Sequence, residues 1–308
     1  MIEVTLLGCG GGMPLPGRYL SATLITYHGR KILIDCGEGT QVSMREINAG
    51  FKSIDLICIT HIHGDHIIGL PGLLGTIGNS GRVDPLIIVG PEGIEEAVKA
   101  ARVIARYLPY EIQVIENPNQ IIRIQNQYVK GELSLLTHPV DHSIPCLAYQ
   151  IQVDRRPKFD SQKAIHYAVP KVLWSQLQKL DQSIEFEGKV YHSNQVMGEA
   201  RKGLTICLVT DTRPIPSLIN FIHGCDLLIC EGTYGSDQDI NKAIHNKHMT
   251  FKEAATLAKN GHVKQLLLTH FGAAMSNPRE YLSNATTVFE RTILGEDHLD
   301  IELNYKTH

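Results

Sequence analysis

Four short apolar stretches of the sequence each end in a side chain that can bind a metal ion or move a proton. LICIT is followed by His61, ICLVT by Asp211, LLIC by Glu231 and LLLT by His270. Apolar, β-branched runs of this length are typical of buried strands. A capping or turn role would explain any one of these polar residues, but not all four. We therefore expect the four strand ends to share a site along one sheet edge, on loops carried by a rigid scaffold.

Ten apolar runs of this kind alternate with helical patterns along the 308 residues. Strands and helices that mix over the whole chain favour an α/β class over separate all-α and all-β modules. Helical patterns cover Gly39–Asn48, Gly69–Ile77, Gly93–Arg106, Pro214–Phe221, Phe251–Asn260 and Pro278–Leu294. We expect a single domain over 1–308, with a polar, irregular insertion at about 154–203.

The expected insertion is also the basic part of an acidic chain. Residues 155–202 carry nine Lys and Arg against five Asp and Glu, while the whole chain has a formal net charge of −3. One basic segment on an acidic body is what a protein needs if it grips a polyanion through a single arm. An ordinary solvated surface would also explain these charges.

The cysteines and the N-terminus indicate the compartment. Seven cysteines are an odd number without a CxxC pair, and most lie in apolar runs, so we expect reduced, buried thiols in a cytoplasmic protein. The opening MIEVTLLGCGGG lacks the basic n-region and cleavage site of a signal peptide. No apolar run approaches the ~20 residues of a membrane-spanning helix, so no membrane partner is expected.

The densest group of ligand side chains lies in ITHIHGDHIIG. His61 and His63 are two apart, so in an extended chain they share a face and can grip one ion. Asp65 and His66 follow a turn glycine and can reach a second position nearby. Imidazole and carboxylate ligands suit Zn²⁺, with Mn²⁺ or Fe as alternatives. Two metal ions ~3.5–4 Å apart explain this density better than one closed structural site.

Two ions need further ligands downstream, and three side chains are available. They are His142 in HPVDHSIP, Asp211 in VTDTRP and His270 in LLLTHFG. A carboxylate can bridge both ions, and each histidine can complete one site. His138 is a rival to His142, which we prefer.

The glycine-rich stretch LLGCGGGMP does not indicate a nucleotide loop. No helix begins behind Gly10, Gly11 and Gly12, and Pro14 and Pro16 follow them. We expect a tight turn between the first two strands.

Eight motifs follow one another nearly from end to end: LLGCGGGMP, LIDCGEGTQ, THIHGDHIIGLPGLL, VDHSIPCLAY, TDTRP, CEGT, KHMT and LLLTH. In this order they resemble the metallo-β-lactamase superfamily and, within it, the ribonuclease Z family of tRNA 3′-processing endonucleases. DCGEGTQ and GDHIIGLPGLL are characteristic of that family rather than of lactamases or glyoxalases. The resemblance implies a four-layer αβ/βα sandwich and a homodimer. It also implies a zinc-dependent endoribonuclease that removes the 3′ trailer of precursor tRNA.

The resemblance further implies roles for single residues. His61, His63 and His142 would bind one zinc ion, Asp65, His66 and His270 the second, and Asp211 would bridge the two. Asp65 would also orient the nucleophile or accept its proton. Glu231 and His248 would form a pair near the scissile phosphate, where His248 stabilises a phosphoryl oxygen or protonates the leaving 3′-oxygen.

A local pattern agrees with the place given to His248. Thr250 and Glu253 form the capping box of the helix that Gly261 ends, so His248 lies just before a helix N-terminus, where donors face an anion.

Three stretches depart from the family pattern. PLPGRYLS stands where the family reads Pro-x-Lys-x-Arg-Asn, VPKVLW where its arm carries Gly-Pro, and FGAAM where it has Ser-Ser-Arg-Tyr. None of these stretches carries a metal ligand, so the alternative function keeps the dinuclear site and changes the substrate to another RNA or a small-molecule diester.

Two non-hydrolytic alternatives are disfavoured. Redox relatives have an HxExD run, and this chain has His63 in place of the glutamate. A binding module should have lost a ligand, and none is missing.

Overall fold

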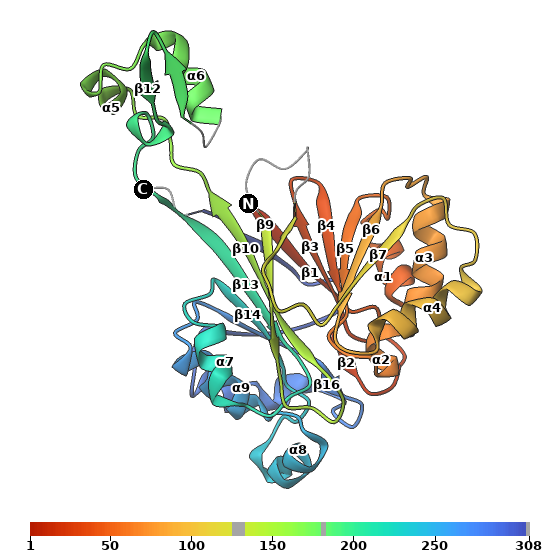
Figure 1. Cartoon of the computed structure of the whole chain (residues 1–308). Helices are drawn as coiled ribbons and strands as arrows, with labels where there is room; N and C mark the ends of the chain where they lie inside the picture. Colours follow the sequence, from red (N-terminus) through yellow and green to blue (C-terminus); the bar gives the residue numbers. More distant parts are fainter. Residues whose placement is uncertain (125–132, 180–182, 306–308) are drawn as a thin grey trace. The chain divides into compact units, whose positions relative to one another are not determined.

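The structure, a computed structural model, describes residues 1–124, 133–179 and 183–305. The chain divides into two compact units, both drawn in Figure 1. The larger unit, the body, comprises Met1–Gln152 and Leu204–His308, and the smaller, the arm, comprises Val153–Gly203.

The first of two seven-stranded sheets has the order β18-β1-β3-β4-β5-β6-β7. Its strands are β1 Ile2–Gly8, β3 Ala22–Tyr27, β4 Arg30–Ile34, β5 Ile54–Cys58, β6 Leu86–Gly90, β7 Ile112–Glu116 and β18 Asp300–Leu303. β1 pairs antiparallel with β18 and β3, whereas β4 to β7 run parallel. β5 and β6 are almost wholly buried, as parallel strands covered on both faces must be.

The second sheet has the order β17-β15-β14-β13-β10-β9-β8. Its strands are β8 Ile122–Ile124, β9 Leu133–Pro139, β10 Leu147–Arg155, β13 Arg201–Val209, β14 Leu227–Glu231, β15 Leu266–Thr269 and β17 Thr292–Leu294. β13, β14, β15 and β17 are parallel neighbours, so their carboxyl ends lie at one edge. A short parallel pair, β2 Gly10–Gly11 and β16 Phe271–Gly272, lies apart from both sheets.

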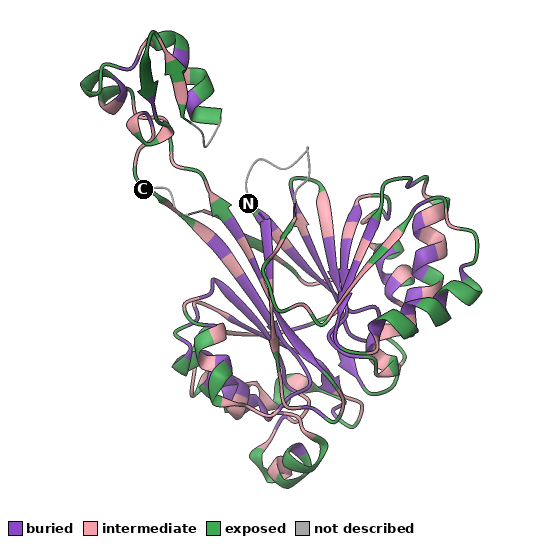
Figure 2. Cartoon of the chain, viewed as in Figure 1, coloured by how far each residue is buried: buried purple, intermediate pink, exposed green. Residues whose placement is uncertain are grey.

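Helices cover the outer faces of the two sheets, which gives four layers (Figure 1). The first sheet is covered by α1 Thr40–Glu46, α3 Leu70–Asn79 and α4 Ile94–Ile104, and the second by α7 Pro216–Phe221, α9 Phe251–Asn260 and α10 Leu282–Thr286. Most strand residues are buried, while the helices are buried on one side only (Figure 2). Shorter helices in the loops are α2 Gly64–Ile67, η2 Asp237–Asp239, α8 Ile240–Asn246 and η3 Pro278–Tyr281. The predicted four-layer αβ/βα sandwich is confirmed.

Residues 278–294 do not form the single helix that the sequence pattern predicts. η3 and α10 follow each other, and β17 then pairs in parallel with β15. Thr286, Thr287 and Val288 are β-branched and favour a helix weakly, while Thr292 and the following apolar residues extend the sheet beside β15. The other five predicted helices are present, with ends shifted by a few residues.

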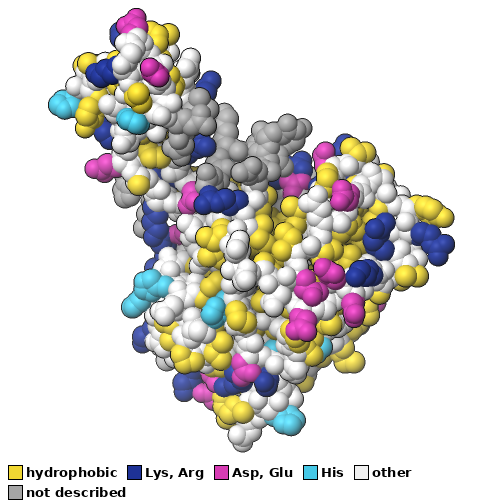
Figure 3. Space-filling view, viewed as in Figure 1, with side chains coloured by type: hydrophobic (Ala, Val, Ile, Leu, Met, Phe, Trp, Pro, Cys, Tyr) yellow, Lys and Arg dark blue, Asp and Glu magenta, His cyan; other side chains and the backbone are white. Residues whose placement is uncertain are grey.

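The arm has a small core of its own, although the sequence indicates a polar, irregular stretch. It contains α5 Ser161–His166, α6 Lys171–Lys179, β11 Ile184–Phe186, β12 Lys189–Tyr191 and η1 Ser193–Gln195. Leu173, Leu177 and Tyr191 are among its buried core residues. Lys and Arg side chains lie on its surface beside acidic ones (Figure 3). Residues 180–182 of the expected insertion lie outside the described residues, and its grip on a polyanion stays a prediction.

Two further expectations concern the membrane and the thiols. Within the described ranges, no helix is both long and apolar enough to cross a bilayer. All seven cysteines are buried and free, as the sequence predicts.

Candidate metal centre

The four polar side chains at strand ends come from strands of both sheets. His61 follows β5 of the first sheet, while Asp211, Glu231 and His270 come from the ends of β13, β14 and β15 in the second. The expectation of one shared sheet edge is therefore wrong for His61. The sequence shows that each strand ends in a polar side chain, but it does not show which strands are neighbours.

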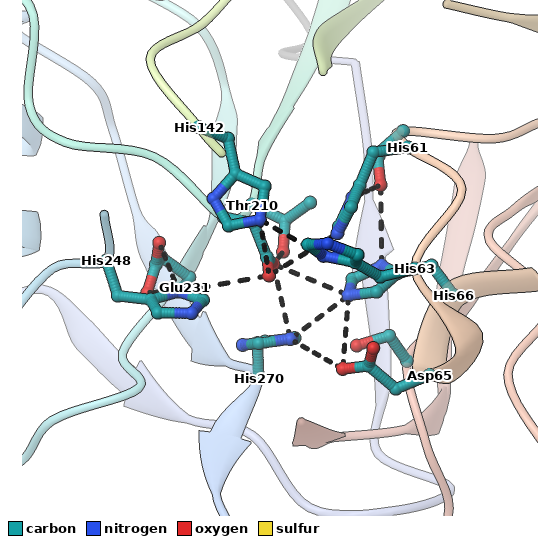
Figure 4. Close-up of polar contacts among 12 residues, drawn as sticks. His61, His63, Asp65, His66, His142, Thr210, Glu231, His248 and His270 are labelled. Atoms are coloured by element: carbon teal, nitrogen blue, oxygen red, sulfur yellow. Dashed lines mark hydrogen bonds and ion pairs between the residues drawn. The ribbon is translucent and has the colours of Figure 1, made fainter. Parts of the chain in front are cut away.

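Besides a group that joins His248 to Asp211 and His270, seven side chains gather into two groups of ligand atoms (Figure 4). His61, His63, His142 and Asp211 form one group, and Asp65, His66 and His270 form the other, with the ligand atoms of each group within 4.8 Å of one another. The structure thus brings together all the residues that the sequence selects for metal binding. His138 lies outside both groups, and its Nε2 is 2.8 Å from the Ser217 hydroxyl.

The carboxylate of Asp211 lies between the two groups. Its Oδ2 is 3.6 Å from His61 Nε2 and 3.9 Å from His142 Nε2. Its Oδ1 is 3.4 Å from His66 Nε2 and 3.2 Å from His270 Nε2. Each oxygen thus serves a different group, which is the arrangement of a bridging ligand.

The nitrogen atoms at the centre fit bound cations. His61 Nε2 is fully buried and has no hydrogen-bond partner among the described residues. His66 Nε2 lies 3.1 Å from His270 Nε2, and His142 Nε2 lies 3.2 Å from His63 Nδ1. Imidazole nitrogens that face one another at such distances suit a metal ion between them.

The electrostatics of the centre support the same interpretation. Burial lowers the pKa of His61 to about 2, helped by the neighbouring His66, so His61 is neutral as a metal ligand must be. Burial alone would raise the pKa of Asp211, but His270, His66 and His61 hold it well below its usual range. Although burial opposes it, the charges of Asp211 and Asp35 raise the pKa of His66 well above its usual value. The centre thus favours positive charge, which a metal ion supplies when bound.

A second layer of side chains, which the motifs in the sequence do not predict, orients the histidines. Asp35 Oδ2 lies 2.8 Å from His66 Nδ1, and the amide of Thr60 donates to Asp35 Oδ1 at 2.7 Å. Thr233 Oγ1 lies 3.0 Å from His270 Nδ1. These contacts leave the Nε2 atoms of both histidines facing the centre, as outer partners do at metal sites. Asp35 had a signal in the sequence, because it directly follows the apolar run KILI.

Glu231 and His248 form a pair beside the ligands. His248 Nδ1 lies 3.2 Å from Glu231 Oε2, and buried Glu231 also accepts from the amides of Thr212 at 2.7 Å and Met249 at 3.1 Å. Burial alone would raise the pKa of Glu231, but the charge of His248 lowers it. Burial alone would lower the pKa of His248, but Glu231 raises it to about 9, so the imidazole is a cation at neutral pH.

The predicted capping box after His248 is confirmed. The amide of Glu253 donates to Thr250 Oγ1 at 3.2 Å, and the amide of Thr250 donates to Glu253 Oε2 at 3.0 Å. The helix α9 therefore starts directly behind the loop that carries His248.

The centre opens onto a cavity of about 640 Å³. Asp65 and His248 line it, together with Met13, Ser143 and Asn246. A cavity of this size with metal ligands at its floor suits a chain end or a small molecule.

The glycine stretch packs against this centre and is not a simple turn. Gly10 and Gly11 form β2, which pairs with β16 directly after His270. A Cβ on Gly11 would lie 2.4 Å from Cε1 of His270. The amide of Gly12 donates to Asp65 Oδ2 at 2.6 Å. The glycines thus let the backbone approach two of the ligands closely.

Comparisons with known proteins agree with this arrangement. The chain is 58% identical over 305 residues to a ribonuclease Z of Clostridium beijerinckii, with 99% of each chain covered. The short form of human tRNase Z has a TM-score of 0.68 at 24% identity, covering 98% of this chain and 99% of that one. The metallo-β-lactamase fold protein YhfI of Bacillus subtilis has a TM-score of 0.68 at 21% identity, covering 97% and 98%. A family profile described as anti-Pycsar protein Apyc1 matches residues 2–89.

We predict that Gly11→Ala weakens metal binding, because the new methyl group would displace the ring of His270. We expect zinc affinity, measured by competition with a chromophoric chelator, to fall about 10- to 100-fold, the range for changes that disturb ligand orientation. Gly75→Ala in α3 is the matched control, since its Cβ would meet no atom within 4 Å. Equal affinities for Gly11→Ala and wild type would contradict the role of this close approach.

Proposed function

The chain belongs to the ribonuclease Z family, and from this premise we propose that it is the metal-dependent endoribonuclease that removes the 3′ trailer of precursor tRNA. The observation that carries the proposal is the meeting of seven ligand side chains around Asp211 at the floor of an open cavity. A chain that kept the fold and lost the hydrolytic site would have no reason to retain this complete set.

We propose two bound ions, both zinc, with manganese or iron as alternatives. His61, His63 and His142 would hold one and Asp65, His66 and His270 the other, with Asp211 between them. When bound, such ions lower the pKa of water and neutralise charge that develops on a phosphate.

The residues around the ligands support in-line hydrolysis of a phosphodiester. Asp65 faces the cavity, held by the Gly12 amide, and is placed to orient a water molecule and take its proton. The water oxygen bonds to phosphorus while the bond from phosphorus to the 3′-oxygen breaks. His248, oriented by Glu231, stabilises a phosphoryl oxygen or gives the leaving 3′-oxygen its proton. The products are a tRNA with a 3′-OH and a trailer with a 5′-phosphate.

Three further proposals concern assembly, substrate grip and compartment. Val103 and Ile104 at the end of α4 and Tyr107 just after it are 68%, 76% and 90% exposed, which supports a homodimer that buries them. Light scattering that gives the mass of one chain would contradict the homodimer.

The net positive charge of the arm supports a role in binding tRNA. The seven free buried thiols support a cytoplasmic location, where thiols stay reduced.

We predict one cut in a precursor tRNA that carries a 3′ trailer, directly after the discriminator base, with product ends mapped at nucleotide resolution. Asp211→Ala should abolish the cut, because it removes the carboxylate shared by both ligand groups. If wild-type protein leaves the precursor intact but hydrolyses a chromogenic diester, the metal site stands and the substrate is another RNA or a small diester.

We predict that Lys158, Lys171 and Lys189, all exposed on the arm, assist RNA binding. Their joint replacement by Gln should raise KM for precursor tRNA. In a plot of the logarithm of RNA affinity against the logarithm of salt concentration, each lost phosphate contact should make the slope shallower by about 1. Hydrolysis of a chromogenic diester should stay unchanged, because the arm holds none of the ligands.

The matched control replaces three exposed body lysines, Lys52, Lys99 and Lys259, by Gln. The change in net charge is the same. An equal rise in KM for both triple variants would show that only total charge matters and would contradict a role for the arm.

A further inference from the structure

Arg213 connects loops that carry residues of the candidate centre. It follows Asp211 by two positions, and its backbone amide donates to the carbonyl of Asp141, next to His142, at 3.1 Å. Its Nη1 donates to the backbone carbonyl of His248. One residue thus contacts both neighbouring loops while it belongs to the loop of Asp211.

The guanidinium of Arg213 is itself held in place. Nη1 donates to Glu253 Oε2 at 3.0 Å, and Nη2 donates to Glu253 Oε1. The same Oε2 accepts from the amide of Thr250, so the pair is built into the first turn of α9. The side chains of Arg213 and Glu253 are 17% and 20% exposed, which protects this forked ion pair from solvent screening.

Hydrogen bonds hold both the amide and the carbonyl of the His248 backbone. Its amide donates to the carbonyl of Ala243 at 2.8 Å, and its carbonyl accepts from Arg213. Its Nδ1 lies against Glu231. Glu231 orients the ring, whereas Arg213 sets where the residue stands relative to the metal ligands.

We propose that Arg213 is a positioning residue that acts through His248, an inference that rests on the role of His248 in the proposed function. The simpler explanation is an ion pair that only stabilises the start of α9. The two explanations differ in one respect: a positioning residue reproduces the kinetic signature of His248 variants, whereas a stabilising pair does not.

The experiment compares Arg213→Gln, His248→Gln and the double variant in the full-length, zinc-loaded protein. The substrates are precursor tRNA and two aryl phosphodiesters that differ only in the leaving group, phenolate or 4-nitrophenolate. We expect Arg213→Gln to lower kcat for the phenyl ester about 10- to 100-fold at nearly constant KM, since misplacement by about 1 Å has effects of this size. The loss of kcat on the phenyl ester, divided by the loss on the 4-nitrophenyl ester, should be the same for Arg213→Gln as for His248→Gln. The double variant should be no worse than His248→Gln within about 3-fold, as for residues that act as a unit.

Two further variants separate positioning from folding. Arg213→Lys keeps one donor for the His248 carbonyl and loses the fork, so it should recover part of the lost kcat. Asp237→Asn weakens the start of α9 elsewhere, because Asp237 accepts from Thr250 Oγ1 at 2.7 Å, and should lower Tm without changing the ratio between the esters.

Three outcomes would each overturn the inference. The losses of kcat in the two single variants could multiply in the double variant, or Arg213→Gln could leave kcat unchanged. Asp237→Asn could also show the same kinetic changes as Arg213→Gln. If wild-type protein hydrolyses both esters but leaves precursor tRNA uncut, the proposed substrate is wrong. The ester comparison still decides the role of Arg213 in that case.

Discussion

One buried carboxylate, that of Asp211, is the interaction on which the rest of the centre depends. A buried charge costs several kcal/mol unless opposite charge or hydrogen bonds compensate it. Oδ1 of Asp211 faces two imidazole nitrogens and Oδ2 faces three, and the nitrogens of each ligand group also face one another. Cations on both sides of this carboxylate would satisfy these atoms together. The fold must therefore bring the ends of strands from two different sheets to one point.

The backbone at these strand ends is held in an uncommon conformation. Asp35, Asp211 and His270 have positive φ values of 61°, 26° and 56°, a region that residues other than glycine rarely adopt. Such positions persist where the surroundings impose them, and they are frequent at functional sites. Here the positive φ values let the residue that follows a buried strand turn its side chain toward the centre. The contacts of Asp35 with Thr60 and of His270 with Thr233 hold two of these turns.

The sequence predicts most of the strands, the layered α/β class and the ligand residues, because each depends on a local pattern. Apolar β-branched runs mark the strands, and the spacing of His61 and His63 marks a site. Strand order is not local, so the assignment of His61 to the edge that carries Asp211 fails. The helix expected over Pro278–Leu294 fails because pairing with β15 overrides a weak helical preference. Thr233 and the arm core were missed because single hydroxyls and scattered apolar residues show no period.

We propose that Asp211 joins two ion sites. Anomalous difference maps from zinc-soaked crystals, recorded on both sides of the zinc edge, test it directly. The account predicts two peaks on opposite sides of the Asp211 carboxylate, one beside His61, His63 and His142 and the other beside Asp65, His66 and His270. A single peak, or peaks that share no contact with Asp211, would contradict it.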